Sequence, residues 1–191
     1  MRRIGRLALF AAVVSTGAPI VVFAVGLALA PQPTDFMCFW AGSDLLARGA
    51  DPYDPGTWAA AVDGLFPNWL GLLRRPPCPG GYAYPLTTAV ATLPLGVLPV
   101  RLAALVWMVL LLGGMAVGIV LIARGFGLGQ RGGLLLAAIT LGSQPAWLTA
   151  LTSQYGGLDL LALGILTLRG AAVRPALSAG ALTVLLLKPH I

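Results

Sequence analysis

The chain has 191 residues, of which 58% are hydrophobic and 9% are charged, and its mean hydropathy is +0.90. A soluble globular domain carries about 25% charged residues, so this composition excludes one and indicates an all-α integral membrane protein. The net charge of +6 comes from basic residues at the ends of apolar runs, where topology signals and lipid headgroup contacts belong. Nucleic-acid binding is not expected, because no basic face with interleaved aromatic residues is present.

The first apolar run covers residues 7–30 and follows Arg2, Arg3 and Arg6. At 1.5 Å per residue it is long enough to cross a hydrocarbon core of about 30 Å. It is also longer than the apolar core of a signal peptide. We therefore predict a retained first transmembrane helix with its N-terminus in the cytoplasm.

Residues 31–85 are the one extended polar region and hold most of the Asp residues, within a loop that covers residues 31–101. We expect an extracytoplasmic loop with interfacial helices. An amphipathic helix is predicted over residues 36–48, with Gly49 as its stop. Its apolar side would form an aromatic belt at the membrane interface, made of Phe36, Phe39 and Trp40.

The loop also contains two cysteines and a turn cluster. Cys38 and Cys78 lack metal-ligand spacing, so no metal site is predicted. A disulfide between them is permitted outside the cytoplasm, but we favour two unrelated cysteines with Cys38 buried. The cluster Asp51–Pro55 is interpreted as structural, because Pro fixes φ and Asp bonds its own backbone.

The next segment, residues 86–100, is apolar but interrupted by Pro94 and Pro99. Its short length suits a helix that lies along the membrane better than one that crosses it. If residues 86–100 do not cross the membrane, most of the Arg residues in short loops face the cytoplasm. We prefer this topology, because basic residues in short loops favour the cytoplasmic side. Four later apolar runs then complete about five transmembrane helices: residues 102–123, 133–151 with a break near Pro145, 155–168 and 175–187.

The whole chain is thus predicted to be one membrane domain, with residues 102–191 as its helical bundle. Gly114 and Gly118 have the GxxxG spacing that lets membrane helices pack closely. The same topology gathers several polar side chains on the exterior face, and this convergence indicates a site there. The residues are Asp35, Tyr84, Gln154, Lys188 and His190.

Asp35 is the leading catalytic candidate. A carboxylate where the first span meets water, beside aromatic side chains, is suited to accept a proton from a sugar hydroxyl. The alternative is that it caps the helix that follows. Asp44 is a candidate second acid, with a solvated surface position as the alternative. Asp159 is the only acid within an apolar span, where it is either functional or bonded within the bundle.

Basic side chains could neutralise a phosphate on the exterior face. Lys188 could do so with Arg74 or Arg75, and His190 could hydrogen-bond the same group. The alternative for Lys188 is a side chain that reaches out to the lipid headgroups. His190 has no partner ligands for a metal.

The order of motifs resembles glycosyltransferase family 87. These motifs are Asp35-Phe36, Phe39–Gly42, Asp51–Pro55, Tyr84–Leu86 and Pro94–Pro99, followed by Ser153-Gln154 and Leu187–His190. Ser153 stands where the family usually has Gly, and His190 where it usually has Gln. Family members are longer, so we expect this chain to be the N-terminal part of a longer protein.

The resemblance implies a GT-C-type polytopic helical bundle that needs no cofactor and lies in the cytoplasmic membrane. Members resemble mannosyltransferases that use a polyprenyl-phosphate donor on the outer face, with a glycolipid or glycan as acceptor. Asp35 matches the family's catalytic base in an inverting transfer. Tyr84, Gln154 and His190 would position sugar or phosphate. Two competing classes are a transporter or lipid flippase that uses Asp159, and a non-catalytic membrane subunit.

Overall fold

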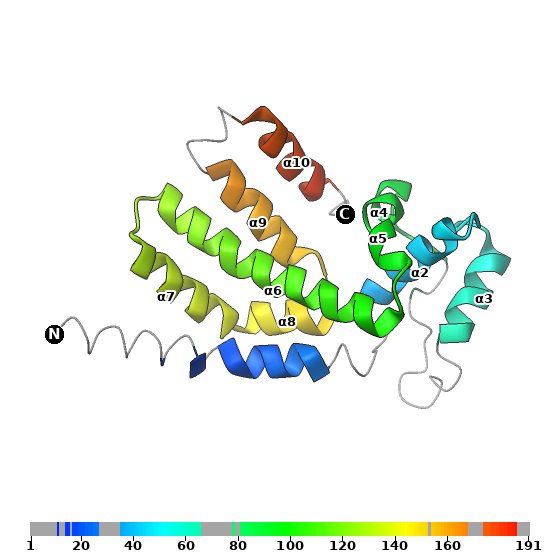
Figure 1. Ribbon diagram of the computed structural model, residues 1–191, viewed down its shortest axis with the longest axis horizontal. Helices are drawn as coiled ribbons and strands as arrows, with labels where there is room; N and C mark the ends of the chain where they lie inside the picture. The colour runs from blue at the N-terminus through cyan, green and yellow to red at the C-terminus, as the bar shows by residue number, and fades with distance from the viewer. Residues whose placement is uncertain are drawn as a thin grey trace. The chain divides into compact units, whose positions relative to one another are not determined.

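The computed structural model describes residues 11, 14–15, 17–26, 35–65, 78, 81–152, 154–167 and 174–186. Within these ranges all regular secondary structure is helical (Figure 1), as the composition predicted. The chain divides into two compact units. Unit 1 comprises Met1–Leu27 and Met108–Leu186, and unit 2 comprises Ala28–Trp107 and Leu187–Ile191.

Unit 1 is a set of apolar helices packed around a small core. Ile20, Met115, Ala146 and Ala150 are buried together, and the rings of Phe23 and Trp147 lie 4.9 Å apart. Its helices are Gly17–Gly26, the part of α6 (Val100–Gly125) from Met108 onward, α7 (Gln130–Leu141), α8 (Gln144–Thr152), α9 (Gly156–Thr167) and α10 (Pro175–Leu185).

Glycine lets two of these helices approach each other closely. A Cβ atom added to Gly114 of α6 would lie 2.9 Å from the carbonyl oxygen of Gly157 in α9, and one added to Gly164 of α9 would lie 2.6 Å from the carbonyl oxygen of Gly118. Both distances are too short for a side chain, so α6 and α9 pack backbone to backbone. The predicted role of the Gly114 and Gly118 spacing is confirmed.

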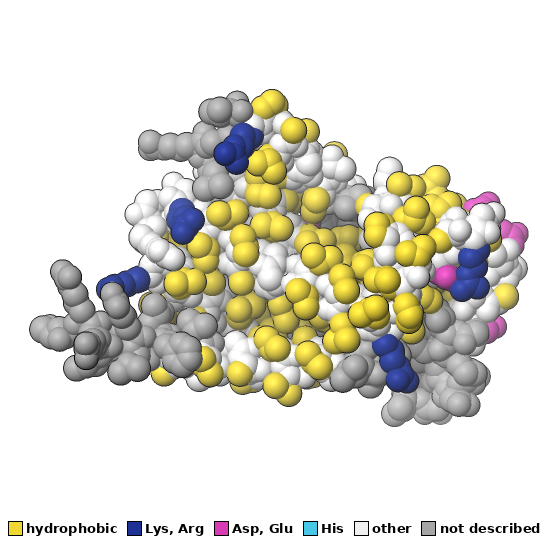
Figure 2. Space-filling view, viewed as in Figure 1, with side chains coloured by type: hydrophobic (Ala, Val, Ile, Leu, Met, Phe, Trp, Pro, Cys, Tyr) yellow, Lys and Arg dark blue, Asp and Glu magenta, His cyan; other side chains and the backbone are white. Residues whose placement is uncertain are grey.

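Among the described residues, α6 is the helix long and apolar enough to cross a membrane. It has 26 residues, and the mean hydropathy of its most apolar stretch is 2.7. Hydrophobic side chains cover much of the surface over α6 (Figure 2), where Val109 is 70% exposed. Exposing such an apolar patch to water would be unfavourable, whereas contact with lipid tails would not be.

The other predicted spans are shorter or bent. α7 and α8 pass the same length and hydropathy criteria only as a pair, and they meet at an angle of 60°, near the predicted break at Pro145. α9 and α10 have 12 and 11 residues. At 1.5 Å per residue each helix is shorter than the hydrocarbon core of a bilayer, which is about 30 Å thick. The described residues therefore contain one membrane-spanning helix, or two if the bent pair is one span, and five spans stay a prediction.

Unit 2 is built around α2 (Asp35–Ala47), which packs against three short helices of the same unit and against Trp107 of α6. The short helices are α3 (Pro55–Leu65), α4 (Leu86–Ala91) and α5 (Leu93–Gly96). α2 lies within one residue of its predicted range, and Gly49 ends it with a φ of +73°, a left-handed conformation that glycine adopts without strain.

The environment of α2 differs from the prediction. Every residue from Phe36 to Ser43 is buried, so the expectation of an amphipathic helix was wrong. The predicted aromatic belt is also a core. Phe39 has no exposed surface and packs at 4.9 Å from the ring of Trp107, while Trp40 is 8% exposed and donates its Nε1–H to the carbonyl oxygen of Leu95 at 3.1 Å.

A buried polar network joins α2 to the α4–α5 segment. Ser43 Oγ lies 2.6 Å from Thr92 Oγ1, which donates to the carbonyl oxygen of Thr88 at 2.7 Å. The carbonyl oxygens of Phe39 and Ala89 also lie within hydrogen-bonding distance of Ser43 Oγ, at 2.7 and 3.0 Å, and share its single proton. Because buried hydroxyls without partners are costly, this network fixes the register between the two segments. α4 and α5, with six and four residues, are each too short to cross a bilayer alone.

Gly96 gives the most specific stability prediction in unit 2. A Cβ added there would lie 2.6 Å from the carbonyl carbon of Ser43 and 2.7 Å from the amide nitrogen of Asp44. Backbone atoms cannot move aside as a flexible side chain can, so Gly96→Ala is expected to lower the free energy of unfolding by about 1–3 kcal/mol.

Thermal or denaturant unfolding of the purified protein measures this effect. Gly113→Ala is the matched control, because a Cβ there would meet no atom within 4 Å and alanine favours helix. If Gly96→Ala unfolds at the same point as Gly113→Ala, the packing of α5 against α2 is wrong.

α3 was not predicted, yet its start follows from the turn cluster. Asp51 Oδ1 accepts from the backbone N–H of Tyr53 at 2.9 Å, and Asp54 Oδ2 accepts from that of Thr57 at 2.7 Å. Asp54 is therefore the N-cap of α3, with Pro55 as its first residue, a favoured arrangement. These hydrogen bonds confirm the structural interpretation of Asp51–Pro55, and those with Thr57 lower the pKa of Asp54.

Candidate functional site

The site is centred on the carboxylate of Asp35, the first residue of α2. The hydroxyl of Tyr84 hydrogen-bonds this carboxylate, although the two residues are far apart in the sequence. Both side chains are half-buried. The partly positive N-terminus of α2 further favours a negative charge at this position. Asp35 lies in the first turn of α2, where its carboxylate can interact with the helix N-terminus. This position does not prevent a catalytic role.

Aromatic packing holds Tyr84 in this position. Its ring lies edge-on to that of Phe39 at 5.8 Å and tilted against that of Tyr82 at the same distance. Its carbonyl oxygen accepts a hydrogen bond from the hydroxyl of Tyr53 at 2.7 Å. Contacts on the ring and on the backbone therefore fix where the Tyr84 hydroxyl points.

Tyr82 fixes the same segment at a second point. Its ring lies directly against Gly42 of α2, and a Cβ there would come within 2.8 Å of Tyr82 Cζ. Only glycine leaves this space, which explains why a helix interior contains the residue despite its low helix propensity. Tyr82 was not predicted from the sequence. A glycine within a predicted helix indicates that another group packs closely against it. The sequence does not show that this group is the ring of Tyr82, because the contact arises from the fold.

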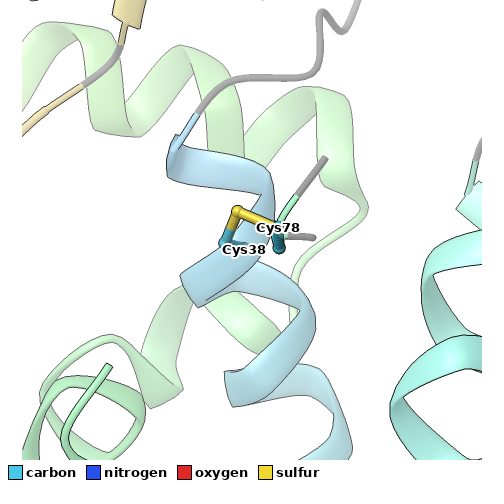
Figure 3. The surroundings of a disulfide bond; sticks show 2 residues. All are labelled: Cys38 and Cys78. Atoms are coloured by element: carbon cyan, nitrogen blue, oxygen red, sulfur yellow. A yellow bond between two sulfur atoms is a disulfide. The ribbon is translucent and has the colours of Figure 1, made fainter. Parts of the chain in front are cut away.

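A disulfide joins Cys38 of α2 to Cys78 (Figure 3), with Cα atoms 5.7 Å apart. The favoured prediction of two unrelated cysteines was wrong, although Cys38 is indeed buried. Cys38 lies about one helical turn after Asp35, and Cys78 precedes Tyr84 by six positions in the sequence. The covalent bond therefore ties the segment that bears the phenol to the helix that bears the carboxylate.

Burial raises the pKa of Tyr84 above its ordinary value, and the charge and hydrogen bond of Asp35 raise it further. Burial also raises the pKa of Tyr82, with smaller contributions from Tyr53 and Tyr84. Both phenols consequently stay protonated at neutral pH. Tyr84 can therefore act as a hydrogen-bond donor to the Asp35 carboxylate throughout the physiological range.

These two pKa shifts predict an alkaline loss of stability. Above the ordinary value of 10.0 the unfolded chain releases the phenolic protons while the folded chain retains them, so stability falls as pH rises. Unfolding measured between pH 8 and pH 12 in the wild type and in a Tyr82→Phe/Tyr84→Phe variant tests this. The variant is expected to lose less stability, and an equally steep loss would contradict the burial of these phenols.

The remaining predicted site residues are distributed between the units. Asp44 Oδ1 accepts two hydrogen bonds from Arg48, at 2.7 and 3.0 Å. The two residues therefore form an ion pair at the surface. Gln154 lies in unit 1, where it is exposed. Asp159 occupies the first turn of α9, where the helix N-terminus stabilises a carboxylate. The others lie outside the described residues: Arg74, Arg75, Lys188 and His190.

The described ranges contain no group of three His, Cys, Asp or Glu side chains that could hold a metal ion. What they do contain is a carboxylate held by a phenol and a helix N-terminus, on a segment fixed by a disulfide. With the apolar α6, these features define a helical membrane protein with a built acidic site.

The comparisons with known proteins identify the family. The profile of glycosyltransferase family 87 matches residues 82–191, which is more than half of the chain. The protein belongs to glycosyltransferase family 87, whose members are membrane proteins, and it is a glycosyltransferase. The matched range includes Tyr84, Gln154, Lys188 and His190, and it begins after Asp35. No curated protein and no solved structure matches the chain.

Proposed function

We propose that the protein transfers a hexose, in the simplest case mannose, from a polyprenyl-phosphate donor to a glycolipid or glycan acceptor. The reaction takes place on the outer face of the cytoplasmic membrane, within a multi-pass GT-C-type helical bundle whose N-terminus is cytoplasmic. The observation that carries this proposal is the Asp35 carboxylate, held by Tyr84 on the segment where the family match begins.

In this mechanism Asp35 is the general base. It removes the proton of an acceptor hydroxyl as the acceptor oxygen attacks the anomeric carbon. The bond from that carbon to the phosphate oxygen breaks, and polyprenyl phosphate leaves with the bonding electron pair, so the configuration at the anomeric carbon inverts. Tyr84 orients the carboxylate, because its ring and backbone are fixed by Phe39, Tyr82 and Tyr53.

The leaving phosphate needs positive charge and hydrogen-bond donors. Lys188 with Arg74 or Arg75 would neutralise it, and Gln154 and His190 would position phosphate or sugar. These residues are assigned from their types and from the family's motif order. No metal or other cofactor is required, since basic side chains and hydrogen bonds provide the stabilisation.

The disulfide supports an extracytoplasmic position for unit 2. Disulfides persist in oxidising compartments and are rare in the cytoplasm. The bond between Cys38 and Cys78 lies in the same unit as Asp35, so the carboxylate and the bond share one compartment. A polyprenyl-phosphate sugar presented on the outer leaflet would meet the site there.

A transfer assay with the full-length protein in lipid nanodiscs tests this function. The donors are radiolabelled polyprenyl-phosphate mannose and, separately, a nucleotide-activated mannose, with a membrane glycolipid extract as acceptor. We expect the label to enter a glycolipid only from the lipid-linked donor, with release of polyprenyl phosphate. Transfer from the nucleotide sugar without turnover of the lipid donor would contradict the proposal.

The structure gives no specific support to the alternative of a transporter or flippase that uses Asp159. Its place in the first turn of α9 explains the carboxylate without an ion pathway.

A further inference from the structure

A cleft of about 620 Å³ lies between α2 and α3 in unit 2. It is lined by Trp40, Asp44, Arg48 and Thr57, together with alanines of both helices. Its volume is in the range of small-molecule sites. The cleft begins about one and a half turns beyond Asp35, because its lining residues from Trp40 to Arg48 follow Asp35 by five to thirteen residues, roughly 8–20 Å at 1.5 Å per residue.

The charges in the cleft favour a neutral ligand. Asp44 and Arg48 form an ion pair at 2.7 Å, with side-chain exposures of 16% and 69%. Acidic and basic side chains lie together on the surface over α2 and α3 (Figure 2). Because the pair compensates its own charge, the lining attracts neither a phosphate nor a cation strongly. It still offers charge-assisted hydrogen bonds to hydroxyl groups.

The remaining lining is mostly apolar. Trp40 is only 8% exposed and directs its Nε1–H to the carbonyl oxygens of Leu95 and Leu98, so only a small part of its indole reaches the wall. The alanines keep the opposite wall shallow, and Thr57 adds a hydroxyl. Apolar surface with a few placed polar groups is the usual composition of a specific small-molecule site.

We infer that this cleft binds the distal sugars of an oligosaccharide acceptor. The inference rests on the proposed function, since it assigns to the transfer reaction an acceptor subsite a few sugar rings away from Asp35. Asp44, Arg48 and Thr57 would hydrogen-bond the sugar hydroxyls, and the alanines of α3 would contact an apolar face of the ring. Asp44 is then a binding residue, in place of the second catalytic acid that the sequence suggested.

Binding to an array of mannose-containing di-, tri- and tetrasaccharides, with the full-length protein in nanodiscs, tests the cleft without any need for catalysis. Ala60→Phe fills the cleft, and Ala59→Phe is the matched control, because Ala59 is exposed on α3 outside the lining. We expect Ala60→Phe and Asp44→Asn to weaken oligosaccharide binding at least about tenfold. Ala59→Phe is expected to bind as the wild type does.

The outcomes separate this inference from the proposed function. If no saccharide on the array binds the wild type, or if Ala60→Phe and Asp44→Asn bind normally, the cleft is not an acceptor subsite. If saccharide binding depends on Ala60 and Asp44 but the wild type transfers no sugar from the lipid-linked donor, the subsite stands and the proposed donor is wrong. Asp44→Asn also covers the case in which Ala60→Phe fails to fold.

Discussion

Replacing Asp35 with asparagine is expected to lower the rate of sugar transfer by about 10²–10⁴-fold, the usual contribution of a general base. Asparagine keeps the size of the side chain and the start of α2, but its amide cannot accept the acceptor proton at neutral pH. The KM for the lipid-linked donor is expected to change little, because the carboxylate acts on the acceptor hydroxyl. Steady-state kinetics of the full-length protein in nanodiscs measure both quantities.

Asp63→Asn is the matched control for this experiment. Asp63 is an exposed carboxylate on α3, so the same chemical change there is expected to leave the transfer rate at the wild-type value. An Asp35→Asn protein that folds normally and transfers sugar at an undiminished rate would remove Asp35 from the mechanism.

Breaking the disulfide is expected to have the second largest effect. Cys78→Ser opens a link between residues 40 positions apart, and the loss of such a link typically lowers the free energy of unfolding by about 2–4 kcal/mol. The segment that bears Tyr84 also loses its covalent attachment to α2, so the carboxylate is less well oriented. We expect the transfer rate to fall at least about tenfold, which corresponds to about 1.4 kcal/mol in the barrier.

Treatment with a reductant provides the internal comparison. The wild type is expected to lose activity on reduction and to regain it on reoxidation. A Cys38→Ser/Cys78→Ser variant, which starts at the lower rate, should not respond to the reductant. A wild-type protein that keeps its full rate when reduced would show that the bond does not support the site.

The helical segments of this chain could be predicted closely where local signals are strong. α2 has an acidic residue in its first turn and Gly49 directly after its last turn, and its range was predicted to within one residue. Its environment could not be predicted, because the residues that cover it come from α3, α4, α5 and Trp107. A window of sequence shows which residues are apolar, but not how many neighbours surround them.

α3 was missed although its start has a recognisable signal. Asp54 followed by Pro55 is a helix N-cap followed by a preferred first residue, and the two were assigned to a turn. The disulfide could not be assigned from two cysteines in one loop, because cysteine pairing depends on the distance between Cα atoms in the fold. Both errors concern the same unit, which has few hydrophobic repeats to guide a prediction.

The described helices contain one or two of the five predicted membrane spans, so the number of spans stays a prediction. Hydropathy registers apolar composition over a window, so α7 and α8 were predicted as one span with a break near Pro145, and their 60° bend lies close to that position. The α6 span was predicted well, because its 26 residues contain no proline and no acidic side chain.

The candidate site could be predicted in part. The expected exterior face included Asp35 and Tyr84, and the structure brings these two side chains into contact. The sequence assigned Tyr84 to sugar or phosphate, which stays a prediction, and the structure adds its hydrogen bond with the Asp35 carboxylate. Tyr82 and Gly42 were not selected, since their importance arises from a ring packed against a helix backbone.

The central claim is that Asp35 acts outside the cytoplasm, and the native cysteines test it most directly. Intact cells that produce the full-length protein are treated with a membrane-impermeant reductant and then with a membrane-impermeant maleimide, and the peptide that contains Cys78 is examined by mass spectrometry. The account predicts that Cys78 is labelled in intact cells only after reduction. Labelling that requires lysis but no reductant would place unit 2 in the cytoplasm and contradict the account.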